Sequence, residues 1–235
     1  MKKAFKVILM VLVATFYSCE KDNESIDSIS PILSDDVLNG TIINYTSSEF
    51  DSVKVFGDNK YFIGRGSITT AGKFSIPLFI PILTKYTPME GVIVSDTSAL
   101  TGSSSGFSTY KNSEGTGFLE KCNFTSYDST NTSGASCSDF VYADKEITIK
   151  GKNVYFGNGV FEGTTRSITR VFNLTLKKGW NEVVIKTDLY SETSDNLTIN
   201  RSYTNVITTD LQWRYFPYSI LFDRSNTRKY SFRNL

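Results

Sequence analysis

The chain has 235 residues and almost balanced charge, with 25 lysine and arginine residues against 24 aspartate and glutamate residues. It contains no histidine, which excludes a Ser-His-Asp or Cys-His nucleophile, a histidine-ligated metal site and an imidazole acid–base catalyst. The lack of a basic excess argues against nucleic acid as a partner.

The N-terminal residues have the three-part order of an export signal. Lys2 and Lys3 form a basic start, residues 7–14 form a short apolar run, and Ser18 precedes Cys19. A basic start stays on the cytoplasmic side while the apolar run enters the bilayer. The run is well short of the ~20 apolar residues that span a membrane, so residues 1–18 are predicted to be a signal peptide and not a transmembrane helix.

This order resembles the lipobox of bacterial lipoproteins, in which the cysteine is diacylated and becomes the first mature residue. Ser18 fits that pattern, whereas Phe16 and Tyr17 are bulkier than it usually allows. The resemblance implies palmitate-type chains on Cys19, and two acyl chains suffice for stable anchoring. The alternative is an ordinary signal peptide with an incidental cysteine. Cleavage removes three lysines and leaves 22 basic and 24 acidic residues, a net charge of −2.

Residues 19–36 are predicted to form a lipidated, flexible tether, because they carry charges, serines and Pro31 but little apolar surface. Lys21-Asp22-Asn23-Glu24 resembles the surface-export signal of Bacteroidetes-type lipoproteins. The resemblance implies an outer-membrane anchor in the cell envelope, with the domain exposed at the surface and the membrane as a partner through Cys19. A plain solvated linker is the alternative.

From residue 37 onward the apolar residues alternate with period two, and no long segment has a helical stripe. This pattern predicts a β-domain over residues 37–235. Strands are expected over residues 38–45, 52–56, 60–66 and 72–78. Pro77 and Pro81 place the end of the last of these at a sheet edge or beyond it.

Gly40-Thr41-Ile42, Val53 with Val55, and Gly72-Lys73-Phe74-Ser75-Ile76 resemble the carboxypeptidase regulatory-like domain, a transthyretin-like β-module. The resemblance implies a structural, adhesion or spacer unit and no catalysis. The β-domain is then either one unit or two sub-units, residues 37–95 and 96–235.

Residues 96–139 are poor in aliphatic side chains, yet a structureless loop of that length is uncommon in a compact domain, so two strands are expected within them. The better candidate for such a strand covers residues 117–124, and it is expected to face residues 138–142. Cys122 and Cys137 then lie near each other, and an oxidising compartment favours a disulfide between them. Two buried free cysteines or a metal pair are the alternatives, although two thiols without histidine make a poor zinc site.

Two catalytic patterns in the chain are weak. Ser104 lies in Gly102-Ser103-Ser104-Ser105-Gly106, which matches the nucleophile elbow but lacks the flanking strand and helix and the histidine. A glycoside hydrolase needs only a carboxylate pair. Asp139, Asp144 and Glu162 are candidates for it, and solvated turn residues are the alternative.

After residue 144 the alternation becomes regular. Short strands are predicted over residues 146–150 and 154–156, separated by Gly151. Residues 170–176 and 180–186 are predicted to form a hairpin, with Gly179 in the left-handed position of the loop. Residues 197–207 and 211–218 complete the sheet. Phe140–Asp144 together with Leu174–Asn181 resemble uncharacterised Bacteroidetes-type lipoproteins, which implies one continuous β-fold and no known activity.

The densest aromatic cluster is Trp213-Arg214-Tyr215-Phe216-Pro217-Tyr218. On a strand, Trp213 and Tyr215 point to one face and Arg214 to the other. An exposed ring beside a guanidinium stacks well on a sugar, so these three residues are the candidate ligand site. Core packing is the alternative, and it is expected for Trp213, Tyr215 or both.

The sequence therefore predicts an all-β protein, an antiparallel β-sandwich with immunoglobulin-like or transthyretin-like features, after a signal peptide and tether. We expect a lipid-anchored, non-catalytic surface binding or adhesion module for a glycan or a surface protein, without a cofactor. A structural envelope component without a small ligand and a histidine-free glycoside hydrolase are the alternatives.

Overall fold

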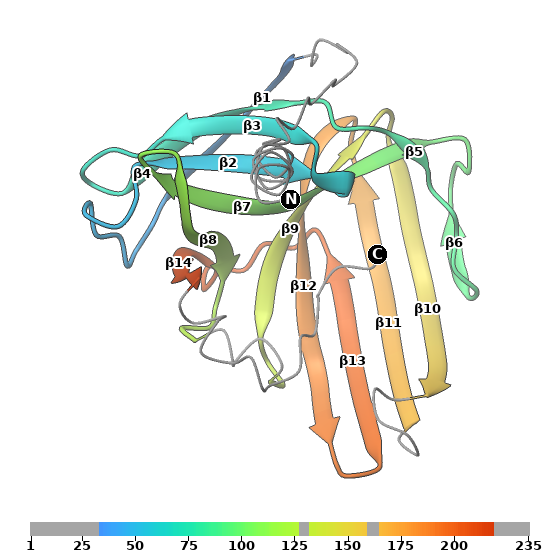
Figure 1. Ribbon diagram of the computed structural model, residues 1–235. Helices are drawn as coiled ribbons and strands as arrows, with labels where there is room; N and C mark the ends of the chain where they lie inside the picture. The colour runs from blue at the N-terminus through green and yellow to red at the C-terminus, as the bar shows by residue number, and fades with distance from the viewer. Residues whose placement is uncertain (1–32, 127–131, 159–164, 219–235) are drawn as a thin grey trace, which may run out of the picture. The chain divides into compact units, whose positions relative to one another are not determined.

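The computed structural model describes residues 33–126, 132–158 and 165–218. They belong to one compact unit, residues 32–235. The predicted signal peptide, Cys19 and most of the predicted tether lie outside the described residues. The all-β prediction is confirmed, because the described residues form a mostly antiparallel sheet of fourteen strands, with a single short 3-10 turn at Asp58–Lys60 (Figure 1).

The strands are, in chain order, β1 (Leu33–Thr41), β2 (Ser52–Gly57), β3 (Phe62–Ser67), β4 (Lys73–Phe79), β5 (Thr84–Lys85), β6 (Val92–Val94), β7 (Leu100–Lys111), β8 (Glu114–Cys122), β9 (Ser136–Ala143), β10 (Ile147–Asn158), β11 (Thr165–Leu176), β12 (Gly179–Glu192), β13 (Asn196–Thr204) and β14 (Gln212–Pro217). They are hydrogen-bonded in the order β1-β4-β3-β2-β7-β8-β9-β12-β13-β11-β10-β6, with β14 paired to β8 and β5 paired to β7.

The first half of the sheet, from β1 to β8 with β14, bends until its edges meet. An isolated parallel bridge joins Ile42, just after β1, to Trp213 in β14, and the Ile43 amide donates to the Trp213 carbonyl at 3.1 Å. These strands enclose the first core, whose buried members include Val53, Ile76 and Phe107. Because these side chains come from both sides of residue 95, the core spans the possible boundary between residues 37–95 and 96–235.

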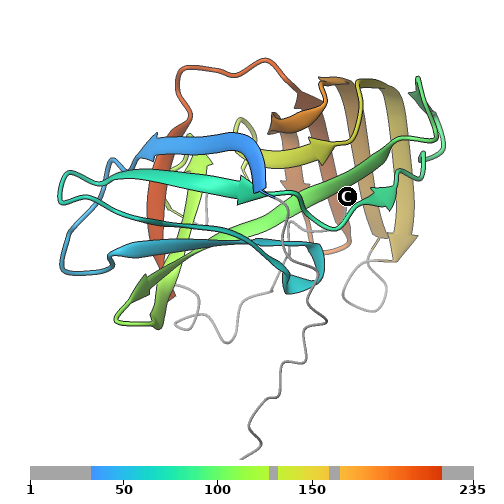
Figure 2. The same cartoon turned by 90° about the horizontal axis from the view of Figure 1, so that it is seen from above.

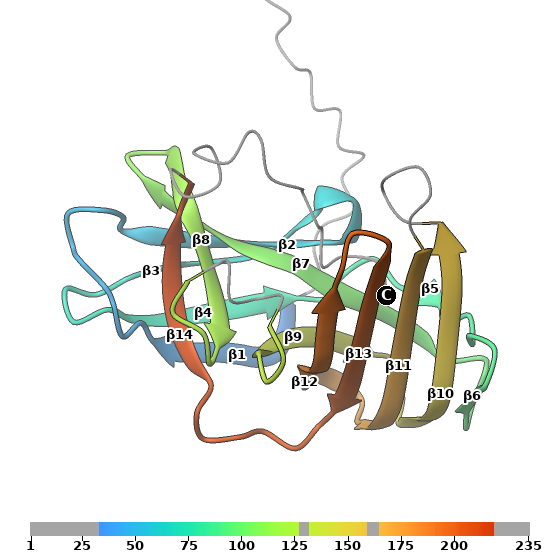
Figure 3. The same cartoon turned by 90° about the horizontal axis from the view of Figure 1, so that it is seen from below.

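The second half of the sheet consists of β9, β12, β13, β11, β10 and β6, and its four longest strands lie side by side (Figures 1 and 3). One face carries the second core, with Ile147, Phe172 and Leu176 among its buried members. Tyr86 and Met89, from the segment between β5 and β6, pack against it. Figure 2 shows the two halves from above.

Two predictions near the N-terminus need correction. The tether was expected to reach residue 36, but β1 already begins at Leu33, and the Asp36 carboxylate accepts a hydrogen bond from the Trp180 amide at 3.2 Å. Pro77 was expected at a sheet edge, but β4 lies between β1 and β3. The sheet accommodates Pro77 because β1 is irregular beside it and β3 pairs with β4 only through Gly64 and Leu78.

The predicted hairpin of residues 170–176 and 180–186 is also wrong. β13 lies between β11 and β12, parallel to β11 and antiparallel to β12. Asn205, directly after β13, fills the fork where β11 and β12 diverge. Its side-chain oxygen accepts from the Thr175 amide at 2.7 Å, and its side-chain nitrogen donates to the Glu182 carbonyl at 3.2 Å. One side chain thus takes the place of a backbone pair.

Gly151 does not separate two strands, because β10 runs unbroken through it. A side chain at Gly151 would collide with the Gly91 carbonyl, so this glycine allows β6 to approach β10 closely. The strand expected over residues 117–124 corresponds to β8, but it pairs with β7 and β14 and meets β9 only at Cys122 and Cys137.

Candidate functional site

The predicted ligand site at Trp213, Arg214 and Tyr215 does not offer an exposed ring. Trp213 and Tyr215 are both buried in the first core. The Trp213 ring lies 5.1 Å from those of Phe74 and Phe107, in edge-to-face contact. Arg214 points to the other side of β14 and donates to Gln212 at 3.2 Å. The structure therefore favours the core-packing alternative for both aromatic residues.

Cys122 and Cys137 lie directly opposite each other on β8 and β9, but the structure does not contain the predicted disulfide. Both are buried free cysteines, which was one of the alternatives. The Cys122 thiol instead donates to the Phe124 carbonyl at 3.4 Å, in an apolar cluster that includes Phe216. Burial raises the pKa of Cys122 to about 12 and that of Cys137 well above its usual range.

The catalytic candidates that the structure describes are not assembled into a site. Ser104 lies in the middle of β7, without the strand-to-helix turn of a nucleophile elbow, and donates to the Asp139 carboxylate at 3.2 Å. Asp139 lies in β9, and Asp144, five residues after Asp139, comes directly after the end of that strand. Extended backbone separates them by about 17 Å, beyond the spacing of a glycosidase pair. Glu162 lies outside the described residues.

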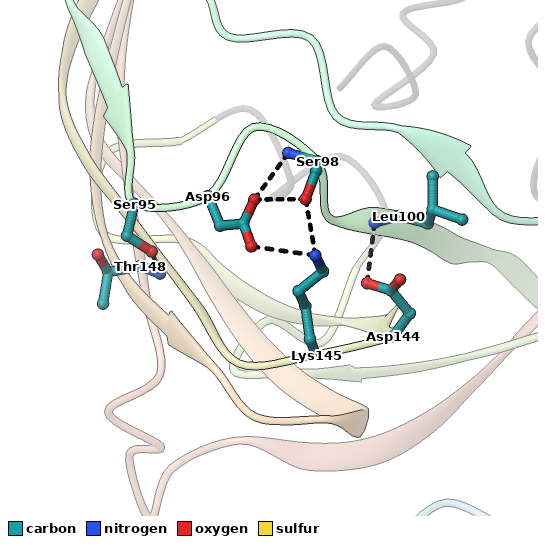
Figure 4. Close-up of polar contacts among 7 residues, drawn as sticks. All are labelled: Ser95, Asp96, Ser98, Leu100, Asp144, Lys145 and Thr148. Atoms are coloured by element: carbon teal, nitrogen blue, oxygen red, sulfur yellow. Dashed lines mark hydrogen bonds and ion pairs between the residues drawn. The ribbon is translucent and has the colours of Figure 1, made fainter.

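A polar network joins the segment between β6 and β7 to the turn before β10 (Figure 4). The Asp96 carboxylate accepts from the Ser98 hydroxyl at 2.7 Å, and Lys145 donates to both Asp96 (3.0 Å) and Ser98 (2.7 Å). The hydrogen bond from Ser98 and then that from Lys145 lower the pKa of Asp96 to about 2. Asp144 accepts from the Leu100 amide at 2.9 Å beside it. The network holds the segment between β6 and β7 against the turn before β10, and the Ser98 and Leu100 amides take part in it by donating to Asp96 and Asp144.

A second ion pair joins the two halves of the sheet. Lys121 in β8 lies 2.6 Å from Glu182 in β12, and both side chains are largely buried. The Ser138 hydroxyl also donates to Glu182. Nothing in the local sequence around these three residues indicated the pair, since the strands that bring them together are distant in the chain.

No group of three or more histidine, cysteine, aspartate or glutamate residues within the described ranges could hold a metal ion. In the same part of the chain, no helix has the length and apolar content needed to cross a membrane.

The outer face of β10, β11, β13 and β12 is the side of the sheet turned away from the second core. Residues that pair across neighbouring strands share a face, so the register arranges it in four rows that each cross all four strands. The rows are Phe156-Ser167-Thr198-Ser191, Val154-Thr169-Asn200-Leu189, Lys152-Val171-Ser202-Lys186 and Lys150-Asn173-Thr204-Val184. Of these residues only Val184 is buried.

Hydroxyl and amide side chains form the middle of this outer face. They come from β11 and β13, where Ser167 pairs with Thr198 and Thr169 with Asn200. The intervening residues, such as Ile168 and Ile199, are buried on the opposite side. We call this set of hydroxyl and amide side chains on β11 and β13 the ladder. It follows from the strict alternation of outward and buried side chains along these two parallel, neighbouring strands.

Exposed apolar side chains border the ladder on β10. Phe156 is 76% exposed and Val154 is 40% exposed, and they pair with Ser167 and Thr169. The first two rows contain no charged residue. From strand spacings they cover about 14 Å across the strands and about 7 Å along them. An aromatic ring beside an open, uncharged array of hydroxyl and amide side chains suits a sugar chain better than a small enclosed ligand.

This outer face could not be recognised from the sequence alone. The alternation of Ser167, Ile168 and Thr169 was readable, but nothing local showed that β13 would lie beside β11. Comparisons with known proteins add no further assignment: no protein-family model, no curated protein and no solved structure matches the chain.

Proposed function

We propose that this protein is a non-catalytic binding module for neutral polysaccharides and that the outer face of the second half of the sheet is its binding surface. The observation that carries the proposal is the position of Phe156, whose exposed ring stands beside Ser167 and the hydroxyl-and-amide ladder. This site replaces the one expected at Trp213, Arg214 and Tyr215, whose two aromatic rings are buried.

The chemistry of a sugar chain matches the two parts of this surface. The C–H face of a pyranose ring packs on an aromatic ring, while its hydroxyls exchange hydrogen bonds with hydroxyls and amides. Lys150, Lys152 and Lys186 lie on the rows farther from Phe156, and Lys186 is 3.5 Å from the carboxylate of Asp188. The side chains of the Phe156 and Val154 rows are all uncharged, which favours a neutral polymer over an acidic one.

A panel of soluble neutral polysaccharides, including a β-glucan, a xylan and an α-glucan, tests the proposal by affinity electrophoresis of residues 32–235, the compact unit. We expect retardation by at least one polymer. Phe156→Ala should weaken binding roughly tenfold, the magnitude expected for one stacked ring. The double variant Thr169→Ala with Asn200→Ala should weaken it as well.

Tyr61→Ala is the matched control, because Tyr61 is also an exposed aromatic residue (47%) but lies outside the second half of the sheet. Absence of binding to every polymer would overturn the proposal and favour a structural envelope component. Release of reducing ends from any polymer would instead favour the hydrolase alternative.

The proposed setting of this module is the cell envelope, on the surface side of the outer membrane, anchored by diacylated Cys19. The support is the order of residues 1–24 in the sequence. Cys19→Ser should abolish labelling by a fatty-acid probe and release the protein from the membrane fraction, because acylation requires the thiol. Equal labelling of the variant and the native chain would contradict the anchor.

A further inference from the structure

The outer edge of β10 is only partly paired. β6 pairs with it over Ile149–Gly151 alone, and the Lys152 amide still donates to the Gly91 carbonyl at 3.0 Å. Beyond that point, residues 153–158 pair with β11 on one side and with no other described strand on the other side. An edge of this kind presents unpaired backbone groups to solvent.

The free edge lacks the usual protection against strand pairing. Its residues, Asn153-Val154-Tyr155-Phe156-Gly157-Asn158, include no charged residue and no proline. Three consecutive side chains, Val154, Tyr155 and Phe156, are exposed on both faces of the strand. Natural sheets usually place lysine, proline or a bulge at such an edge.

The direction of the free backbone groups follows from the hydrogen bonds already made. The Lys152 amide and the Thr148 carbonyl both point toward β6 and the residues around it. Because the pattern alternates along a strand, Val154 and Phe156 present their N–H and C=O groups outward, whereas Asn153 and Tyr155 are bonded to β11.

We propose that this edge pairs with the same edge of a second copy of the chain, in an antiparallel arrangement centred on Tyr155. In this register Val154 of one copy lies opposite Phe156 of the other, and both residues have outward backbone groups, so each such pair exchanges two hydrogen bonds. The pairing also places a β-branched side chain against an aromatic one, a favourable cross-strand combination.

A second copy fits this edge better than a charged partner, because the segment is neutral and complementary to itself in this register. An isologous contact of this type closes on itself and ends at two chains. The outer faces of the two copies would then form one continuous surface. The pairing does not require polysaccharide binding, since it uses the backbone of β10 and the Val154 and Phe156 side chains and none of the hydroxyl or amide side chains on β11 and β13.

Light scattering and sedimentation of residues 32–235 over a range of concentrations test the pairing. We expect a monomer–dimer equilibrium that Val154→Pro shifts to monomer, because proline removes an outward N–H without breaking a bond to β11. Val154→Lys should have the same effect and provides a second variant if the proline variant fails to fold. Val171→Lys, on the outer face of β11 away from the edge, is the control and should still dimerise.

Cysteine cross-linking tests the register. Tyr155 meets its own counterpart in a non-hydrogen-bonded pair, with Cα atoms about 4.5 Å apart, within reach of a disulfide. Tyr155→Cys should therefore form a covalent dimer under mild oxidation, and Val154→Cys should form much less. A native chain that stays monomeric at every concentration, or dimerisation unaffected by both Val154 variants, would overturn the proposal.

Discussion

Cys122 and Cys137 face each other across β8 and β9 at the only register pair that joins these two strands, yet they are not bonded. The sulfur of Cys122 is directed to the Phe124 carbonyl. Both thiols belong to a small apolar cluster between the two halves of the sheet. They act as buried apolar side chains at this seam.

Native protein should therefore resist thiol alkylation at neutral pH. Burial raises the pKa of both thiols, so the reactive thiolate is scarce and shielded. Intact mass after alkylation of residues 32–235 should show two added groups when the protein is denatured without reductant, and almost none when it is native. Tyr61→Cys, at an exposed position, is the positive control. Denatured, unreduced protein without added groups would show that a disulfide forms after all.

Loss of Asn205 should destabilise the sheet at the fork between β11 and β12. Asn205→Ala leaves the Thr175 amide and the Glu182 carbonyl without their partner, at a cost of about 1–3 kcal/mol. Urea unfolding measures the loss. Val206→Ala, at the next, exposed residue (69%), is the control and should change stability by less than about 0.5 kcal/mol. Equal stabilities for the two variants would contradict this role.

Trp213→Ala should lower the free energy of unfolding by about 3–5 kcal/mol, as expected for a large aromatic side chain in a core. Tyr215→Phe removes only the hydroxyl that donates to the Thr116 carbonyl at 3.1 Å, and should cost about 1 kcal/mol. Thermal and urea unfolding measure both losses. A Trp213→Ala protein as stable as the native one would place this ring outside the core.

Ser98→Ala should raise the pKa of Asp96 toward its ordinary value of 3.8, because the Ser98 hydroxyl contributes most to the shift. In the native protein the lowered pKa means that Asp96 favours the folded state above about pH 3.8 and that this contribution disappears as the pH falls toward about 2. A carboxyl NMR titration measures the change. Ser95→Ala, which affects only the bond from the Thr148 amide, should leave the Asp96 titration unaltered.

Local alternation predicted a large part of the strands. The buried series Phe74, Ile76 and Leu78 located β4, and the structure places all three in the first core. β7 was not located, because its buried side consists largely of small or polar residues, among them Gly102, Ser104 and Thr109. Such residues give no alternation of apolar and polar side chains that could be read from the sequence. β7 is held in place by its pairing with the strands on either side.

Long-range order was the part that sequence could not supply. Residues 176–179 have the chemistry of a tight hairpin loop, and only the insertion of β13 separates the two strands. The same insertion creates the ladder of the outer face. Trp213 shows the same limit for burial. Alternation correctly put Trp213 and Tyr215 on one face of the strand, but it did not show that this face packs against Phe74 and Phe107 in the first core.

Amide chemical-shift mapping of residues 32–235 tests the binding surface most directly, with a neutral polysaccharide that retards the protein in affinity electrophoresis. We predict that the changes concentrate on β10, β11 and β13 around Phe156, Thr169 and Asn200, and that they disappear in Phe156→Ala at the same polymer concentration. Changes centred on the first half of the sheet, or a Phe156→Ala protein with the native pattern, would contradict the proposed site.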